Sequence, residues 1–136
     1  MKKILFLLIA AMLVSCDKAF INGDLDGMWH LESVASPERT ENPDIIFYSF
    51  QRHMVQLSRH YDIGLPDRLL GEFERHGNSI TMHNFYTFPL EKQKATLEML
   101  KEYHIQDDSV EFTIITLDEE NLVMKNRERT YTLRKW

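Results

Sequence analysis

Hydrophobic and polar residues alternate along most of the chain with a period of two, which is typical of half-buried β-strands. In residues 28–34, Trp29 and Leu31 share one face of the expected strand while His30 and Glu32 share the other. Seven further stretches have a strand-forming composition and are separated by turns or loops. They are residues 45–50, 53–59, 68–75, 79–85, 109–117, 122–126 and 130–136. The pattern therefore predicts eight strands.

The alternation stops at residues 90–103, which contain no glycine and no proline and directly follow Pro89. Leu90, Leu97 and Leu100 recur near the helical period. This stretch predicts a helix of about three to four turns with a narrow apolar stripe, placed between strands five and six. We expect the helix to cover an edge, the wall or an open end of the sheet.

Eight short strands with mostly tight connections indicate an all-β, antiparallel, up-and-down barrel. Gly27 lets the backbone approach the floor of the barrel, and Trp29 is expected to close the floor. The shared parity within each strand directs one set of side chains inward. These residues are Trp29, Leu31, Phe47, Leu69, Phe73, Ile80, Met82, Phe112, Ile114, Met124, Tyr131 and Leu133.

The interior of an eight-stranded barrel either fills with side chains or holds one small ligand. Burial of the apolar residues favours a filled core, because a domain without a disulfide needs that burial for stability. Gly71, Ser33 and Ser49 are small or polar residues on the expected inward faces, and they leave room for a ligand. Both alternatives stay open at the level of the sequence.

Residues 1–15 have the features of a secretory signal peptide. Lys2 and Lys3 precede an apolar run over residues 4–14, which is shorter than the roughly 20 residues of a membrane-spanning helix. Small residues then lead to Cys16, in an order that resembles the lipobox of bacterial lipoproteins. The resemblance implies that Cys16 is lipidated and becomes the mature N-terminus. We therefore divide the chain into a signal peptide (1–15), a lipidated N-terminus and tether (16–24) and a barrel domain (25–136).

The chain carries a formal net charge of −5, and since Lys2 and Lys3 lie in the leader, the remainder carries −7. No lysine- or arginine-rich run is present, so we expect no nucleic-acid partner. A net acidic surface also opposes electrostatic docking to anionic lipids, which leaves the acyl chains on Cys16 as the expected membrane attachment. Cys16 is the only cysteine of the chain, so a disulfide within the chain is excluded.

Nothing in the sequence has the pattern of a catalytic or metal site. The six histidines include no pair at a spacing that favours ligation from one strand or one helix. The carboxylate pairs Glu72/Glu74 and Asp107/Asp108 fall on an outward face and in a turn, where solvated surface is the expected role. The chain carries no nucleophile motif and no phosphate-binding loop. We therefore expect no enzyme activity, no cofactor and no metal.

Several motifs together resemble the lipocalin-like lipoproteins of Gram-negative bacteria, over residues 23–136. They are the lipobox, Gly-Met-Trp at 27–29, Leu-Asp at 117–118, Asn-Leu-Val-Met at 121–124 and Tyr-Thr-Leu-Arg-Lys at 131–135. The resemblance implies an eight-stranded barrel with a cup-like cavity. It also implies a basic residue of the last strand, Arg134 or Arg129, packed over Trp29, where a cation–π contact contributes about 0.5–2 kcal/mol. The chain departs from typical lipocalins in lacking a disulfide and in placing its helix between strands five and six.

These observations predict a lipid-anchored envelope protein that binds a small apolar or amphipathic ligand. The expected ligand-binding residues are Trp29, Leu31, Phe47, Leu69, Gly71, Phe73, Met82, Phe112, Met124 and Tyr131. The alternative is a protein-interaction or inhibitor module with a filled core, acting through loops 35–43 and 60–67 or helix 91–103. We expect the outer membrane as the location. Asp17 favours inner-membrane retention in some bacteria, so the membrane and its leaflet stay open.

Overall fold

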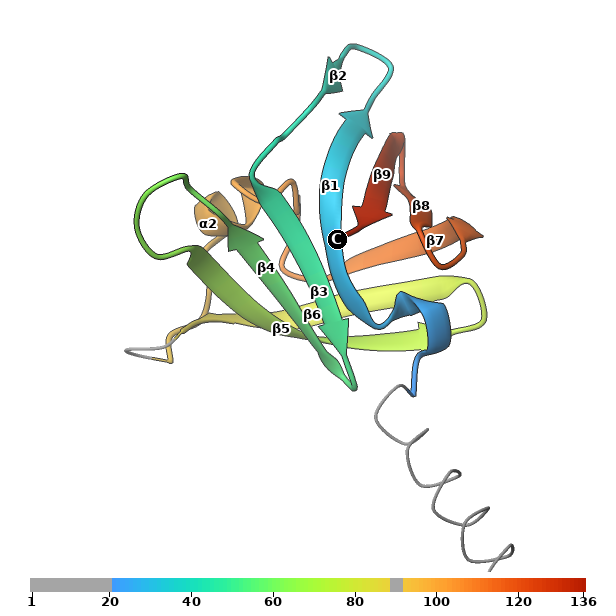
Figure 1. Ribbon diagram of the computed structural model, residues 1–136. Helices are drawn as coiled ribbons and strands as arrows, with labels where there is room; N and C mark the ends of the chain where they lie inside the picture. The colour runs from blue at the N-terminus through green and yellow to red at the C-terminus, as the bar shows by residue number, and fades with distance from the viewer. Residues whose placement is uncertain (1–20, 89–91) are drawn as a thin grey trace, which may run out of the picture.

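The computed structural model describes residues 21–88 and 92–136 (Figure 1). Across these residues no helix is long and apolar enough to cross a membrane. The elements in chain order are η2 (a 3₁₀ helix, Gly23–Leu25), β1 (Gly27–Ala35), β2 (Thr40–Glu41), β3 (Ile46–Gln51), β4 (Met54–Arg59), β5 (Asp67–His76), β6 (Ser79–Thr87), α2 (Leu97–Lys101), β7 (Val110–Leu117), β8 (Asn121–Asn126) and β9 (Arg129–Lys135).

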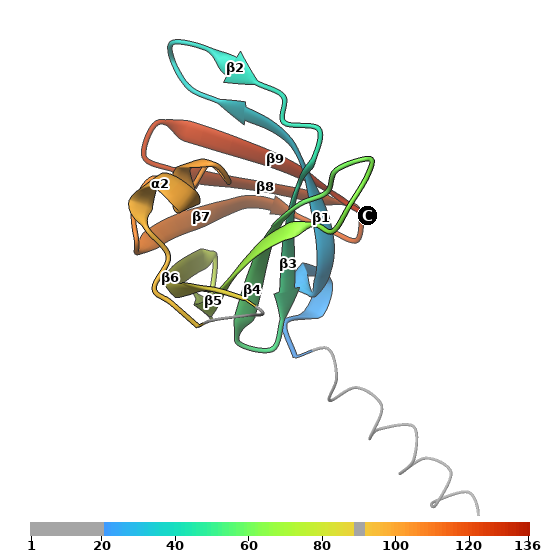
Figure 2. The same ribbon diagram turned by 90° about the vertical axis from the view of Figure 1, so that its left-hand side faces the viewer.

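The strands form one antiparallel sheet that closes on itself, as Figures 1 and 2 show. Neighbours in the sheet follow the order β1-β3-β4-β5-β6-β7-β8-β9, and β9 returns to pair with β1. The two-residue strand β2 adds to β1 outside this ring, within the predicted loop 35–43. The structure confirms the prediction of an eight-stranded, up-and-down antiparallel barrel. It also confirms the place of the helix, because β6 and β7 are the fifth and sixth strands of the ring. The extra strand β2 was not predicted.

Trp29 closes one end of the barrel, which we call the floor. Its side chain is fully buried, and its Nε1 donates a hydrogen bond to the Leu25 carbonyl oxygen at 2.9 Å. The cation over its ring is Lys135, with Nζ 4.3 Å from the ring centroid, so the expectation of Arg134 or Arg129 is wrong. The register explains this, because Lys135 pairs with Trp29 and therefore points to the same side of the sheet.

In strand β3 the residues that face the barrel interior are those predicted to face outward. Tyr48 and Phe50 point into the barrel and are buried, whereas Phe47 is buried on the outside. There the Phe47 ring packs against His60, His30 and Trp136, at centroid distances of 4.6, 5.0 and 5.1 Å. The inward placement of Phe47, and of its expected neighbour Ser49, is therefore wrong. Both faces of this strand are apolar, so alternation alone does not select the inner one.

A β-bulge in β1 changes the parity within that strand as well. The pairing with β9 shifts between Leu31 and Ser33, which places one extra residue in β1. As a result Val34 is buried after Leu31, while Ser33 remains partly exposed. The prediction that Ser33 leaves room inside the barrel is therefore wrong.

The helix between β6 and β7 is much shorter than predicted. Only Leu97–Lys101 is helical; Thr96, just before it, has an extended backbone, and Lys94 forms a bridge to Tyr86. Residues 90–91, where the predicted helix begins, lie outside the described residues. The Thr96 side chain accepts a hydrogen bond from the Met99 amide, which caps the helix at its observed start. Figure 1 shows α2 and η2 at opposite ends of the barrel.

Candidate functional site

The end of the barrel opposite Trp29 is filled by residues 95–105, which we call the plug. The plug contains α2 and the turn that follows it, and it takes no part in the barrel's ring of strands. Leu100, Tyr103 and Ile105 are its deepest side chains, and all three belong to the buried apolar core. Side chains from outside the sheet therefore complete the core at this end.

A left-handed turn after α2 directs side chains of the plug into the barrel. His104 has a φ of 63°, and the amides of His104 and Ile105 donate to the carbonyls of Lys101 and Leu100, at 3.1 and 3.0 Å. This is the Schellman pattern, in which the residue after the left-handed position packs against the last helical turn. Leu100 and Ile105 are accordingly both buried. Glycine is the usual residue at this position, so a histidine here carries backbone strain.

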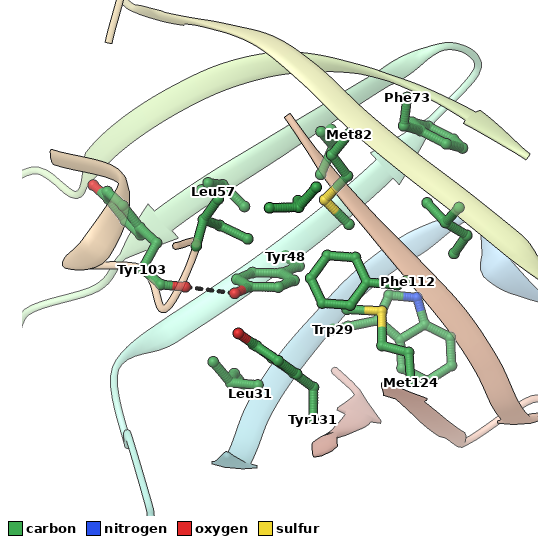
Figure 3. Packing of buried hydrophobic residues seen from close by; sticks show 14 of the residues in the cluster. Trp29, Leu31, Tyr48, Leu57, Phe73, Met82, Tyr103, Phe112, Met124 and Tyr131 are labelled. Carbon is green, nitrogen blue, oxygen red and sulfur yellow. Dashed lines mark hydrogen bonds between the residues drawn. The ribbon is translucent and has the colours of Figure 1, made fainter. Parts of the chain in front are cut away.

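Two tyrosines, one on each of the strands that flank β1, donate hydrogen bonds to the backbone of the plug. The Tyr48 hydroxyl on β3 donates to the Tyr103 carbonyl, and the Tyr131 hydroxyl on β9 donates to the His104 carbonyl, each at 2.5 Å. Figure 3 shows Tyr48 and Tyr131 among the buried side chains, with the hydroxyl of Tyr48 directed at Tyr103. Burial raises the pKa of both tyrosines above the usual value, so both hydroxyls are protonated donors at neutral pH.

Arg59, at the end of β4, connects the plug to the β4–β5 loop. Its guanidinium lies 5.6 Å from the ring centroid of Tyr103 and 5.7 Å from that of Tyr61. The same group pairs with Asp67 at 2.8 Å and with Glu102 at 3.2 Å. Its Nε atom is buried, and no described residue accepts a hydrogen bond from it. A cation with unused hydrogen-bonding capacity therefore lies at the rim of the plugged end.

The side chain of His104 is largely buried, and its Nδ1 lies 3.3 Å from a carboxylate oxygen of Glu41 on β2. Burial lowers the pKa of His104; the carboxylate of Glu41 opposes this shift, and Arg129 and Arg39 add to it. A neutral imidazole therefore suits the closed plug, and protonation of His104 works against it.

The barrel interior is filled in this conformation. The side chains of the apolar core are at most 6% exposed, and the aromatic rings pack edge to face, with centroids 5.0 Å apart for Phe112 and Tyr131 and 5.2 Å apart for Phe50 and Phe73. Of the residues expected to bind ligand, eight lie together in this core. They are Trp29, Leu31, Leu69, Phe73, Met82, Phe112, Met124 and Tyr131.

Gly71 does not leave room for a ligand, contrary to the prediction. A Cβ atom at this position would lie 2.6 Å from Cδ1 of Phe85, because the Phe85 ring lies directly over the glycine. Phe85 was absent from the predicted inward set, as were Tyr48 and Phe50. Gly71 thus serves the close packing of β5 against a ring from β6.

Sequence reasoning missed the residues that act at the plugged end. Tyr48 was missed because both faces of β3 are apolar, so alternation alone does not show which face points inward. Tyr131 was included, but as an apolar lining residue and not as a donor to the plug. Arg59 sits at the last position of β4, where no pattern in the sequence marks it.

One surface groove lies away from the predicted ligand-binding residues. It has a volume of about 1020 Å³ and is bordered by residues 36–38, Thr81, residues 106–107, residues 109–111 and Thr113 at the start of β7, and residues 125–129. Its lining is largely polar and includes none of the predicted ligand-binding residues. Within residues 21–88 and 92–136, no group of three or more histidine, cysteine, aspartate or glutamate side chains is placed to hold a metal ion. Cys16 lies outside the described residues.

Comparison with solved structures places this fold among bacterial lipocalin-like proteins. A lipocalin-like protein from Bacteroides uniformis ATCC 8492 aligns with a TM-score of 0.68 and 19% identity, over 84% of this chain and 100% of that one. An uncharacterized protein from Bacteroides eggerthii DSM 20697 aligns with a TM-score of 0.67 and 17% identity, over 82% and 99%. No curated protein matches the chain.

The family model of the lipocalin-like domain matches residues 11–136, which is nearly the whole sequence. This match agrees with the resemblance that the Gly-Met-Trp and C-terminal motifs carry. It also agrees with the closed barrel, with its tryptophan floor and with the basic residue above that tryptophan. The chain therefore belongs to the lipocalin-like domain family.

Proposed function

We propose that this protein is a lipid-anchored envelope protein that binds a small apolar or amphipathic ligand inside its barrel, and that the ligand enters by displacing the plug. The observation that carries the proposal is that one end of the barrel core is completed by residues 95–105, which are not part of the ring of strands. Lipocalin-like folds are typically binders and not enzymes, so we propose binding without catalysis.

Exchange of plug for ligand is physically reasonable because it replaces one apolar surface with another. Withdrawal of Leu100, Tyr103 and Ile105 exposes apolar wall, at a cost of about 25 cal/mol per Å². A ligand that covers the same wall recovers most of this free energy. The plug itself is a weak element, since a helix of five residues is not stable away from its packing surface.

The proposed anchor would lie at the end of the barrel opposite the plug. The structure begins beside η2 at the floor, and α2 lies at the far end (Figure 1). Four residues separate Cys16 from Ile21, a stretch that reaches less than about 20 Å. A lipid on Cys16 would therefore hold the floor near the membrane and leave the plugged end facing away from it.

Ligand binding is tested with a chain that starts at Asp17, purified without detergent; the closed barrel lies entirely within this chain. Native mass spectrometry detects a co-purifying molecule, and titration with an apolar fluorescent dye, displaced by fatty acids, counts the sites. Leu100→Ala weakens the plug and is expected to raise dye affinity roughly tenfold or more. Leu25→Ala removes the same atoms at the floor and provides the matched control.

Saturable, displaceable binding at one site that is stronger in Leu100→Ala than in Leu25→Ala supports the proposal. Absence of binding in both the native chain and Leu100→Ala overturns it.

The β4–β5 loop favours a second candidate function, that of a protein-interaction module. Ile63 and Leu65 on this loop are 92% and 87% exposed, which is unusual for two aliphatic residues so close in sequence. Crosslinking of the anchored full-length chain in its native envelope tests this function. A crosslinked partner that disappears with the Ile63→Ser/Leu65→Ser double variant, but persists with Ile115→Ser on β7, would favour it.

A further inference from the structure

The plugged end contains two buried hydroxyl donors that meet on successive backbone carbonyls. Tyr48 and Tyr131 come from strands on either side of β1, and they donate to the carbonyls of Tyr103 and His104. Both rings belong to the apolar core, where few other polar groups are available. Once the plug leaves, both hydroxyls lose their acceptors while still surrounded by apolar side chains.

A ligand that replaces the plug must therefore offer acceptors to two hydroxyl groups that lie close together. A purely apolar molecule leaves both donors unpaired, and each buried unpaired donor weakens binding about tenfold. A carboxylate has two oxygens and accepts both hydrogen bonds, in the stronger charge-assisted form. The donor pair thus selects for a ligand with a compact anionic or strongly accepting head group.

Arg59 adds positive charge at the same end. Its guanidinium lies against the ring of Tyr103, which is the plug residue whose carbonyl Tyr48 holds. Its buried Nε has no hydrogen-bond acceptor among the described residues, and its present partners Asp67 and Glu102 lie at the more exposed rim. Displacement of the plug removes Glu102 and Tyr103 from Arg59, which keeps Asp67 as its carboxylate partner and has its unpaired Nε available to a ligand carboxylate.

We propose that the ligand is an amphipathic carboxylate, with an apolar chain in the barrel and a head group that accepts hydrogen bonds from Tyr48 and Tyr131 and pairs with Arg59. The head group takes the place of the two plug carbonyls, so that plug and ligand compete for the same donors. This inference rests on the proposed function, because it specifies the chemistry of the ligand that enters the barrel.

Paired ligands of equal chain length test the inference: dodecanoate against dodecanol, each displacing the fluorescent dye from the chain that starts at Asp17. The native chain is expected to prefer dodecanoate by about tenfold or more. Tyr48→Phe, Tyr131→Phe and Arg59→Gln are each expected to reduce this preference severalfold, because each removes one of the three groups that bind the head group. Tyr86→Phe serves as the control, because it removes a tyrosine hydroxyl on β6 from a ring that lies beside Lys92. This variant is expected to keep the preference for dodecanoate.

The ratio between the two ligands separates head-group recognition from weakening of the plug, because loss of a tyrosine–plug bond changes both affinities alike. Equal affinity for dodecanoate and dodecanol in the native chain overturns the inference and leaves the proposed function standing. Absence of binding by either ligand, also in Leu100→Ala, overturns both. If a tyrosine variant does not fold, the inference is judged from the ratio of dodecanoate to dodecanol affinity in the native chain and in Arg59→Gln.

Discussion

The Tyr131 hydroxyl donates a hydrogen bond to the His104 carbonyl and thereby ties the last strand of the barrel to the plug. We expect Tyr131→Phe to lower the free energy of unfolding by about 1 kcal/mol, because a buried carbonyl loses its donor while the ring still packs. Urea denaturation followed by circular dichroism measures the change. Tyr86→Phe provides the control, and an equal loss in both variants would show that the bond to the plug contributes nothing.

His104 predicts a pH dependence of stability. Its folded pKa lies below that of the unfolded chain, where the usual value is about 6.5, because burial opposes the charged form. The unfolded chain therefore binds the proton first, and the stability present above pH 6.5 is lost as the pH falls toward the folded pKa. His104→Asn keeps a residue that tolerates the left-handed turn and removes the titration.

Urea denaturation of the native chain and of His104→Asn at a series of pH values from 7.5 to about 5 measures this effect. The native chain is expected to lose more stability than the variant over this range. Glu41, Arg39 and Arg129 are the charged groups that influence His104, so all three are left unchanged. The same pH slope in both proteins would contradict the prediction.

Gly71 and Phe85 are expected to be energetically coupled. Gly71→Ala forces its new methyl group into the Phe85 ring, at 2.6 Å from Cδ1, and is expected to cost about 1–3 kcal/mol of stability. Phe85→Leu alone also destabilises, because it removes buried ring atoms. The double variant is expected to lose less stability than the two single losses together, since leucine vacates part of the space. Strict additivity in chemical denaturation would contradict the observed packing.

Lys135 is expected to stabilise the floor more than its neighbour Arg134 does. Lys135→Met removes the cation over Trp29 and the hydrogen bonds that Nζ donates to the carbonyls of Asp24 and Asp26. We expect a loss of about 1–2 kcal/mol from the cation–π contact and these bonds. Arg134→Met, on the exposed side of the same strand, is expected to change stability by less than about 0.5 kcal/mol. A larger loss of stability in Arg134→Met than in Lys135→Met would instead support the expectation that Arg134 packs over Trp29.

The barrel was predictable from the sequence because most of its strands have one apolar face. Leu69, Phe73, Ile80 and Met82 all point inward as the alternation predicts. Phe47 shows the limit of this reasoning. Its strand is apolar on both faces, and the outer ring is buried only because His30, His60 and Trp136 come from other segments to cover it. Such long-range packing leaves no local signal.

The plug was not predictable, for two physical reasons. Residues 92–96 have helix-compatible composition, but the bridge from Lys94 to Tyr86 and the cap at Thr96 hold them outside the helix. The position of Leu100 and Ile105 inside the barrel then depends on a left-handed turn at His104, where no glycine marks the turn in the sequence. The donor role of Tyr48 follows only from where the plug lies.

Hydrogen exchange in residues 95–105, with and without saturating dodecanoate, tests the central claim most directly. Displacement of the plug predicts faster exchange of the amides of Tyr103, His104 and Ile105, because a five-residue helix does not persist without its packing surface. The amides of β4 and β8 are expected to keep their protection. Binding of dodecanoate with unchanged or slower exchange in the plug would contradict the account, because the ligand would then occupy a different site.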